Sequence, residues 1–170
     1  MDKQLQPIVQ VLEKDFGAEA KESFGEVEVL LSPEYIVAAS QKLRDEFEFT
    51  FLSTITAVDY FPEVSPRFHI VYVLNSFNKN LQLTLRVSVA GENPTVPTLT
   101  EVYKNANWRE RELWDMFGIT VEGHPDLRRL LMPDDWDGHP LRKDYPLGYE
   151  EPQFTFNFEE IDISKPKGEF

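Results

Sequence analysis

The sequence predicts an α+β fold, a sandwich in which helices cover one face of a largely antiparallel sheet, in the order α-β-β-α-β-β-β. Three observations predict it. Two stretches before residue 49 carry apolar side chains at helical spacing, and three apolar stretches between residues 49 and 89 have the length of strands. The connection between the last two strands is too short for a crossover, which favours antiparallel pairing. A helix and a long extended segment rich in glycine and proline are expected to follow.

The first part of the chain is expected to fold as helix, hairpin and helix. Apolar side chains recur at helical spacing over residues 7–16. Gly25 marks the turn of a short hairpin, whose second strand alternates between apolar and acidic residues. Ser32 and Pro33 are expected to be the N-cap and the first residue of the second helix, which ends near Glu48.

Three strands are predicted next, over residues 49–58, 67–77 and 81–89. The second is apolar on both faces, as is typical of a strand inside a sheet. The third alternates strictly between aliphatic and polar residues, so its aliphatic side chains are expected to point inward. For the first strand, the residues expected on one common face are Phe49, Phe51 and Ile55.

A helix over residues 107–117 is predicted after a short helix at residues 98–103. Asn107 is expected to cap the longer helix, and Glu110 to complete a capping box by accepting a hydrogen bond from the backbone N–H of the cap residue. Gly118 has the place of the left-handed residue that commonly ends a helix.

The remainder of the chain is expected to be extended. On the last helix, Arg111 and Asp115 should pair one turn apart. After that helix, only residues 127–131 are expected to form a helical turn or two. A segment of this length without regular structure usually binds something. The chain is therefore divided into an α+β domain at residues 1–117, which includes the capped helix, and an extended partner-docking segment and tail at residues 118–170.

Composition excludes several classes of function. The chain carries 30 acidic and 17 basic residues, a formal net charge of −13, which disfavours binding to nucleic acid because phosphates attract a positive surface. It has no cysteine, so disulfides, thiolate nucleophiles and cysteine ligation of iron–sulfur clusters are excluded for this chain. No run of about 18 apolar residues is present, and the first residues lack the apolar core of a signal peptide. A cytosolic or membrane-peripheral protein is expected.

The tripeptide Gly-His-Pro occurs twice, at residues 123–125 and 138–140. Its two imidazoles, together with Glu112 and Asp115, have the chemistry of a metal site, but the spacing is not that of ligands on one rigid element and arginines crowd the same stretch. A histidine general base is a second hypothesis, for which no nucleophile is evident. Glycine and proline favour a third, in which each tripeptide is a rigid turn whose imidazole bonds to nearby backbone or carboxylate.

Residues 110–147 resemble the signature of a known family, the 30 kDa subunit of respiratory complex I, which in bacteria is the C subunit of NADH–quinone oxidoreductase. The element order predicted before this segment also agrees with the N-terminal fold of that family. The residues that carry the resemblance are Glu110, Arg111, Glu112, Asp115, Phe117, Gly118, Gly123, His124, Pro125, Asp126, Arg128, Arg129, Gly138, His139, Pro140, Arg142, Lys143 and Asp144.

The resemblance implies a non-catalytic subunit in the hydrophilic, peripheral arm of a proton-pumping NADH–quinone oxidoreductase. It implies docking on the 49 kDa (D) subunit, beside neighbouring iron–sulfur subunits, with membrane contact only through the complex and on the cytoplasmic side. It implies no cofactor or metal in this chain, because FMN, the iron–sulfur clusters and quinone are bound by other subunits. The signature residues are then expected to offer charge pairs to a partner. The alternatives are a freestanding metal-dependent enzyme using histidine and carboxylate, and a soluble acidic adaptor.

The tail carries three aromatic residues in alternation. Phe154, Phe156 and Phe158 would lie on one side of an extended strip within residues 152–170. Water is an unfavourable neighbour for three aromatic rings, so the strip is expected to lie on a partner subunit, and the competing hypothesis places it on the chain's own sheet.

Overall fold

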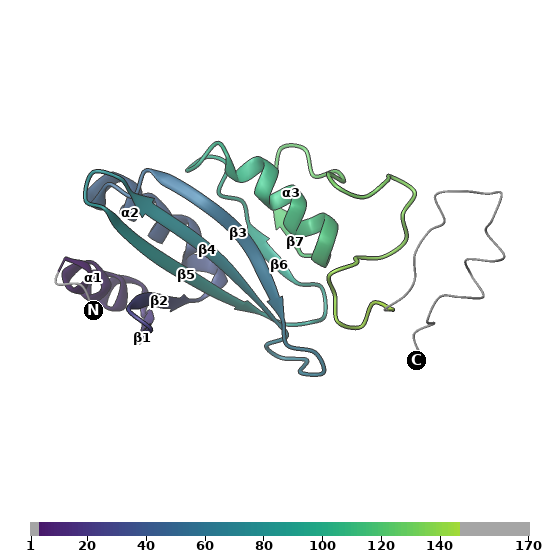
Figure 1. The fold of residues 1–170 in the computed structure, drawn as a ribbon, viewed down its shortest axis with the longest axis horizontal. Coiled ribbons are helices and arrows are strands. Elements are labelled where there is room, and N and C mark those ends of the chain that lie inside the picture. Colours follow the sequence, from purple (N-terminus) through teal and green to yellow (C-terminus); the bar gives the residue numbers. More distant parts are fainter. Residues whose placement is uncertain (1–3, 147–170) are drawn as a thin grey trace.

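The computed structural model describes residues 4–146, and the predicted aromatic strip of the tail lies outside them. Figure 1 shows a twisted sheet with helices packed against it, followed by an irregular segment beside the last helix. The predicted α+β class is confirmed. The elements in chain order are α1 (Leu5–Phe16), β1 (Glu19–Ser23), β2 (Glu26–Leu31), the 3-10 helix η1 (Pro33–Tyr35), α2 (Ile36–Phe47), β3 (Phe51–Asp59), β4 (Phe68–Ser76), β5 (Leu81–Val89), β6 (Thr95–Pro97), α3 (Ala106–Phe117) and β7 (Thr120–Glu122).

The main sheet has five strands in the order β1-β2-β5-β4-β3. All neighbouring pairs are antiparallel except β2 and β5, which run parallel. The strand predicted to lie inside the sheet is β4, which is paired on both edges. The alternation predicted for β5 is confirmed, because Leu81, Leu83 and Leu85 are buried while Gln82 is exposed.

The prediction for the first strand is wrong at one residue. Phe51 is 42% exposed, although Phe49 and Ile55 are buried as expected. The register between β3 and β4 shifts between Leu52 and Thr54, which marks a β-bulge. A bulge inserts one extra residue and therefore reverses the side-chain alternation before it, so Leu52 points inward and Phe51 outward.

The hydrophobic core lies on one face of this sheet. Helices α1 and α2 lie together against it, and α3 packs along β3 (Figure 1). Tyr72, Leu74 and Leu85 are among its fully buried side chains. Each large apolar side chain that is fully buried contributes about 1.5–3 kcal/mol, so this single core stabilises the fold of residues 4–146. None of the helices in that range is long and apolar enough to span a bilayer.

The second helix begins later than predicted. Ser32 is extended and Pro33 is the first residue of η1, but the hydroxyl of Ser32 makes no capping hydrogen bond. The α-helical pattern starts only at Ile36. The helix ends as predicted, at Glu48, which adopts the left-handed conformation at φ 63°.

Two short predicted helices are absent, and a pair of short strands was not predicted. Residues 98–103 form a turn and residues 127–131 form no helix. Instead, β6 and β7 pair in parallel, with Val96 opposite Val121. These strands flank α3 in the chain, so their pairing brings both ends of α3 to fixed positions. The domain division at residue 117 stays a prediction.

Candidate functional site

Most of the signature residues lie on α3 and on the segment that follows β7. We call residues 124–146 the strap. The strap has no regular structure, and it runs beside α3 and then past the C-terminal end of that helix (Figure 1). Backbone hydrogen bonds connect it to α3, for example from the N–H of Leu141 to the carbonyl of Met116 at 3.0 Å. The site is therefore one helix with an irregular chain fastened along it.

Asp115 is the centre of this arrangement. Its carboxylate is fully buried, and its Oδ2 accepts hydrogen bonds from the backbone N–H groups of Leu130, Leu131 and Met132 at 3.0, 2.8 and 2.9 Å. Burial by itself raises the pKa of this carboxyl, but the three N–H groups and the guanidinium of Arg129 outweigh burial and lower the pKa. The ionised carboxylate thus holds three successive residues of the strap.

The predicted ion pair between Arg111 and Asp115 is wrong. Arg111 donates to the carbonyls of Arg128 and Arg129, at 3.1 and 2.9 Å. Arg129 instead pairs with Asp115 at 2.7 Å, and it also donates to the carbonyl of Trp136 at 2.6 Å. The i,i+4 spacing allowed the predicted pair, but the strap supplies donors that fit the buried carboxylate better.

The second half of the strap is fixed by Arg142 and His139. Arg142 donates to the carbonyls of Phe117 and Gly118, at 2.5 and 3.2 Å, which are carbonyls left free at the end of α3. The Nδ1 of His139 lies 2.9 Å from the carbonyl of Asp115, so that nitrogen carries the hydrogen. Burial lowers the pKa of His139, and this keeps the imidazole neutral near pH 7.

Gly118 is needed where α3 ends. As predicted, it is left-handed, at φ 68°, and its N–H bonds to the carbonyl of Trp114. A Cβ at this position would overlap the ring of His139 and the guanidinium of Arg142. The glycine therefore serves both the helix end and the close approach of the strap.

The predicted capping box is wrong. The helix begins at Ala106, so Asn105 is the N-cap residue and Asn107 lies within the first turn. Glu110 is only 2% exposed, and its carboxylate accepts hydrogen bonds at 2.6 Å from the hydroxyl of Thr98 and from the N–H of Leu99. Burial raises the pKa of Glu110, against the effect of those two hydrogen bonds. Its role is to hold the turn before α3.

His124 is buried against the start of α3. Its Nδ1 accepts the N–H of Asp126 at 3.1 Å, and its Nε2 lies 3.2 Å from the carbonyl of Asn107 and 3.9 Å from the carboxylate of Glu110. Both tripeptides thus form turns whose imidazoles bond to backbone, as their glycines and prolines indicate. The glycines that precede the two histidines, Gly123 and Gly138, are left-handed.

The residues of the metal hypothesis are not brought together. His124 contacts Asn107 and His139 contacts Asp115, and eight helical residues separate these contacts by about 12 Å along the axis. The carboxylate of Asp115 is occupied by backbone donors, and Glu112 pairs with Arg109 at 3.5 Å. Within residues 4–146 no three histidine or acidic side chains form a group that could hold a metal ion.

A buried charge network at the end of the strap was missed by sequence reasoning. Arg67 donates two hydrogen bonds at 2.9 Å to Asp59, and it pairs with Asp144 at 2.7 Å. The N–H of Lys143 donates to Asp59 at 2.9 Å. Burial would raise the pKa of Asp59, but hydrogen bonds from Arg67 and from the N–H groups of Lys143 and Phe61 lower it to about 2. The available signal was a single acidic residue at the end of an uncharged strand, followed by an arginine just before the next strand.

Several charged residues of the signature remain exposed, among them Asp144, whose side chain is 39% exposed. Arg128 and Asp126 form a surface ion pair at 3.0 Å, with side chains 70% and 56% exposed. Glu112 is 41% exposed in its pair with Arg109, and Lys143 is exposed at the end of the strap. The other charged residues of the signature bond to the chain's own atoms. Arg111, Arg129 and Arg142 bond to the chain's own backbone, and the expectation that signature residues offer charge pairs to a partner stays a prediction.

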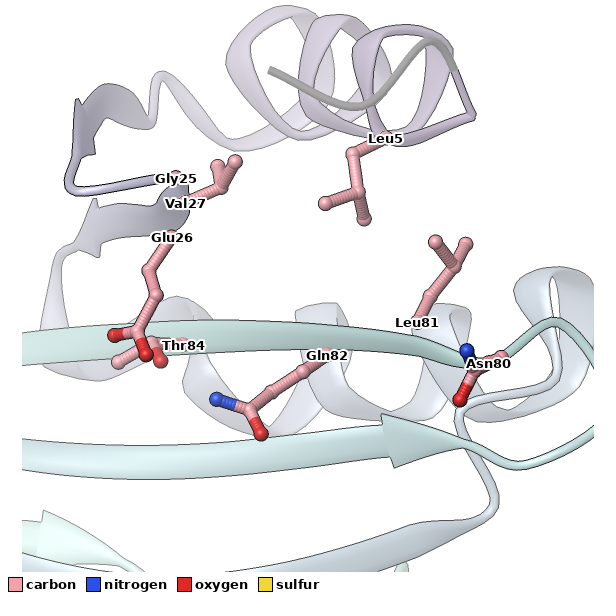
Figure 2. Close-up of a pocket in the computed structure, with 8 residues that line it drawn as sticks. All are labelled: Leu5, Gly25, Glu26, Val27, Asn80, Leu81, Gln82 and Thr84. Carbon is pink, nitrogen blue, oxygen red and sulfur yellow. The ribbon is translucent and has the colours of Figure 1, made fainter.

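A pocket lies away from the strap, between the start of α1, the β1–β2 turn and the start of β5 (Figure 2). Its volume is about 170 Å³, which is below the roughly 300 Å³ of ordinary ligand sites. Figure 2 shows Leu5 and Leu81 facing each other across it, with Glu26 and Gln82 at one side. It contains none of the signature residues.

Comparison with known proteins gives consistent similarities. The family model for "Respiratory-chain NADH dehydrogenase, 30 Kd subunit" matches residues 29–151. The C subunit of the NADH-quinone oxidoreductase of Roseiflexus sp. (strain RS-1) is 50% identical over 144 residues, which cover 84% of this chain and 82% of the relative. A protein of the same name from Herpetosiphon aurantiacus is 46% identical, and 84% of each chain is covered.

Two solved structures share the fold. One is the trypsin-resistant fragment (1-134) of Nqo5, 32% identical with a TM-score of 0.64, which covers 73% of this chain and 99% of the fragment. The other is a chain of the membrane-bound sulfane sulfur reductase, an archaeal respiratory membrane complex. It is 27% identical with a TM-score of 0.69, and the match covers 84% of this chain and 85% of the other.

Proposed function

Because the chain belongs to the family of the 30 kDa subunit of respiratory-chain NADH dehydrogenase, we propose that it is an assembly subunit that docks on the 49 kDa subunit. Its place is that of the C subunit of an NADH–quinone oxidoreductase, complex I, and other subunits of that complex are its partners. The docking element is α3 with the strap. The complex pumps protons, and this chain takes part in that activity only through assembly.

The observation that carries this proposal is that the ionisable side chains of the site make their hydrogen bonds within the chain itself. Asp115 and Glu110 are buried and His139 is half-buried, and each of the three bonds to the chain's own backbone. Such groups build a fixed surface, whereas a catalytic acid or base needs access to a substrate proton. The supported role is that of a rigid scaffold for contact with another protein.

Cofactor binding is assigned to the other subunits. The sequence has no cysteine, so it lacks the ligands that most iron–sulfur clusters require. The pocket of Figure 2 is smaller than ordinary ligand sites and is lined by none of the signature residues. We propose that FMN, iron–sulfur clusters and quinone are bound by neighbouring chains, and that this chain belongs to the hydrophilic arm on the cytoplasmic side of the membrane.

Affinity purification tests the proposal. The tagged chain is purified from gently solubilised membranes, and its partners are identified by mass spectrometry and by native gel. The expected result is co-purification with the 49 kDa and iron–sulfur subunits, together with NADH–quinone reductase activity. A tagged chain that is recovered alone and holds one tightly bound metal ion would instead support a freestanding enzyme. Recovery alone and metal-free would support an acidic adaptor.

A further inference from the structure

We propose that three exposed apolar side chains, Trp108, Leu131 and Leu141, form the surface through which α3 and the strap contact another subunit of the complex. We call them the apolar stripe. They are 59%, 60% and 50% exposed. This inference rests on the proposed function and deepens it, because it replaces the charged signature residues by a specific set of contact residues.

The stripe follows α3 from its first turn to its end. The guanidinium of Arg111 lies 5.2 Å from the ring of Trp108 and bonds to the backbone of the strap just before Leu131. Leu131 itself donates its N–H to Asp115, and Leu141 donates its N–H to the carbonyl of Met116. The helix positions that hold the three residues therefore follow in order along α3, from Trp108 to Met116, which are about 12 Å apart along the helix axis.

Each member of the stripe is held in place by the body of the protein. Trp108 belongs to α3, and its ring is stacked by a buried arginine. Leu131 and Leu141 belong to an irregular segment, but their own N–H groups are bonded to α3. A surface that is already ordered loses little conformational entropy on binding, which favours affinity. Tryptophan is also enriched among the residues that dominate binding energy at interfaces.

Charged residues surround the stripe in the sequence, and they include the exposed carboxylates of Asp134, Asp135 and Asp137 as well as two ion pairs. Arg128 is paired with Asp126, and Arg109 with Glu112. Exposed pairs of this kind contribute little, about 0–1 kcal/mol, and do not attract a strongly charged ligand. An apolar centre with a polar border is the usual anatomy of a protein–protein contact. The partner surface is therefore apolar and bordered by hydrogen-bonding groups.

Two other occupants are disfavoured by the charge of the chain. A second copy would bring together two molecules of net charge −13, which repel each other. An anionic bilayer surface repels the same charge and attracts basic segments instead. The occupant that fits is another subunit of the same complex.

The test compares two triple variants in the tagged complex. The stripe variant carries Trp108→Ala, Leu131→Ser and Leu141→Ser. The control variant changes three exposed apolar residues elsewhere, as Phe24→Ser, Val64→Ser and Phe77→Ser, which are 106%, 62% and 71% exposed in the wild type. Because interface residues of this class commonly change affinity by more than about tenfold, the stripe variant should retain less than about a tenth of the partner subunits. The control variant should retain them as the wild type does.

A second measurement covers the case in which the stripe variant folds poorly. Hydroxyl-radical oxidation of Trp108 is measured in the free wild-type chain and in the purified complex. Strong protection of Trp108 in the complex is expected, whereas equal oxidation in both would overturn the inference. Full retention of partners by the stripe variant would also overturn it while leaving the proposed function standing. Failure of the wild type to retain partners would overturn the proposed function instead. Self-association or vesicle binding of the free chain that the stripe variant abolishes would assign the stripe to another occupant.

Discussion

Replacing Asp59 by asparagine should strongly destabilise the isolated chain. The carboxylate of Asp59 is 3% exposed and accepts four hydrogen bonds, two from Arg67 and one each from the N–H groups of Phe61 and Lys143. The asparagine amide has the same shape but no charge, and its NH₂ group would take the place of a carboxylate oxygen that accepts hydrogen bonds. Arg67 would then keep the more exposed carboxylate of Asp144 as its charged partner, while residue 59 would offer one neutral acceptor oxygen.

The pKa of Asp59 gives the magnitude. Each pH unit of pKa change corresponds to about 1.4 kcal/mol, so a carboxyl lowered from 3.8 to about 2 stabilises the fold by about 2.5 kcal/mol at neutral pH. Leaving a buried arginine partly unpaired adds to the loss. We expect Asp59→Asn to lower the free energy of unfolding by about 2–4 kcal/mol, which for a chain of this size lowers the melting temperature by roughly 5–15 °C.

Urea unfolding at a series of pH values checks both the size and the sign. The contribution of Asp59 is present above its unfolded pKa and is lost as the pH falls through its folded pKa of about 2. The difference between wild type and Asp59→Asn should therefore be constant above about pH 5 and shrink below about pH 4. Asp144→Asn is the matched control, with an expected loss of about 1 kcal/mol or less because Asp144 is 39% exposed. Equal losses in both variants, or a difference that does not change on acidification, would refute the reasoning.

Three further predictions concern the strap, its histidines and the tail. Asp115→Asn should lower the free energy of unfolding by about 3–5 kcal/mol in urea titrations, because it leaves a buried arginine uncompensated. Asp134→Asn, on the exposed part of the strap, should stay within about 0.5 kcal/mol. His124→Ala and His139→Ala should lower the melting temperature while elemental analysis finds metal content unchanged, whereas loss of a stoichiometric metal would contradict this. Deleting residues 152–170 should leave the melting temperature of the isolated chain within about 2 °C, a change of less than 1 kcal/mol, and reduce its retention in the complex. The opposite pattern would assign the tail to the chain's own core.

Periodicity predicted the sheet well because burial on one face imposes it directly. In β5 each second residue is aliphatic and each of those is buried, so the sequence alone indicates which face meets the core. The error at Phe51 arose from a bulge, which adds one residue to a strand without a local marker. The β6–β7 pair was missed because its strands have three residues each, and so short a run carries no period.

Local rules failed where a buried polar group finds a partner far along the chain. Glu110 has the spacing of a capping box, but its carboxylate bonds to Leu99, which precedes the helix. Asp115 has the spacing of an ion pair within the helix, but it bonds to residues 130–132. A buried carboxylate must satisfy several acceptor sites, and consecutive backbone N–H groups of an irregular segment supply more donors than one side chain. The spacing of residues within the helix does not indicate these contacts with residues outside it.

The charged residues of the family signature act mainly within the chain. They suggested pairs with a partner, yet Arg129 and Arg142 donate to carbonyls of their own chain. Arginine suits this task because its guanidinium carries several donors in a fixed plane and can join segments that have no regular structure. The charged groups that shape this surface lie beneath it, and the proposed contact is made by neighbouring residues such as Leu131, whose N–H bonds to Asp115, and Leu141, whose N–H bonds to the carbonyl of Met116. A partner would recognise the apolar stripe. Substitution of a buried arginine would affect binding of that partner only by changing the conformation of the strap.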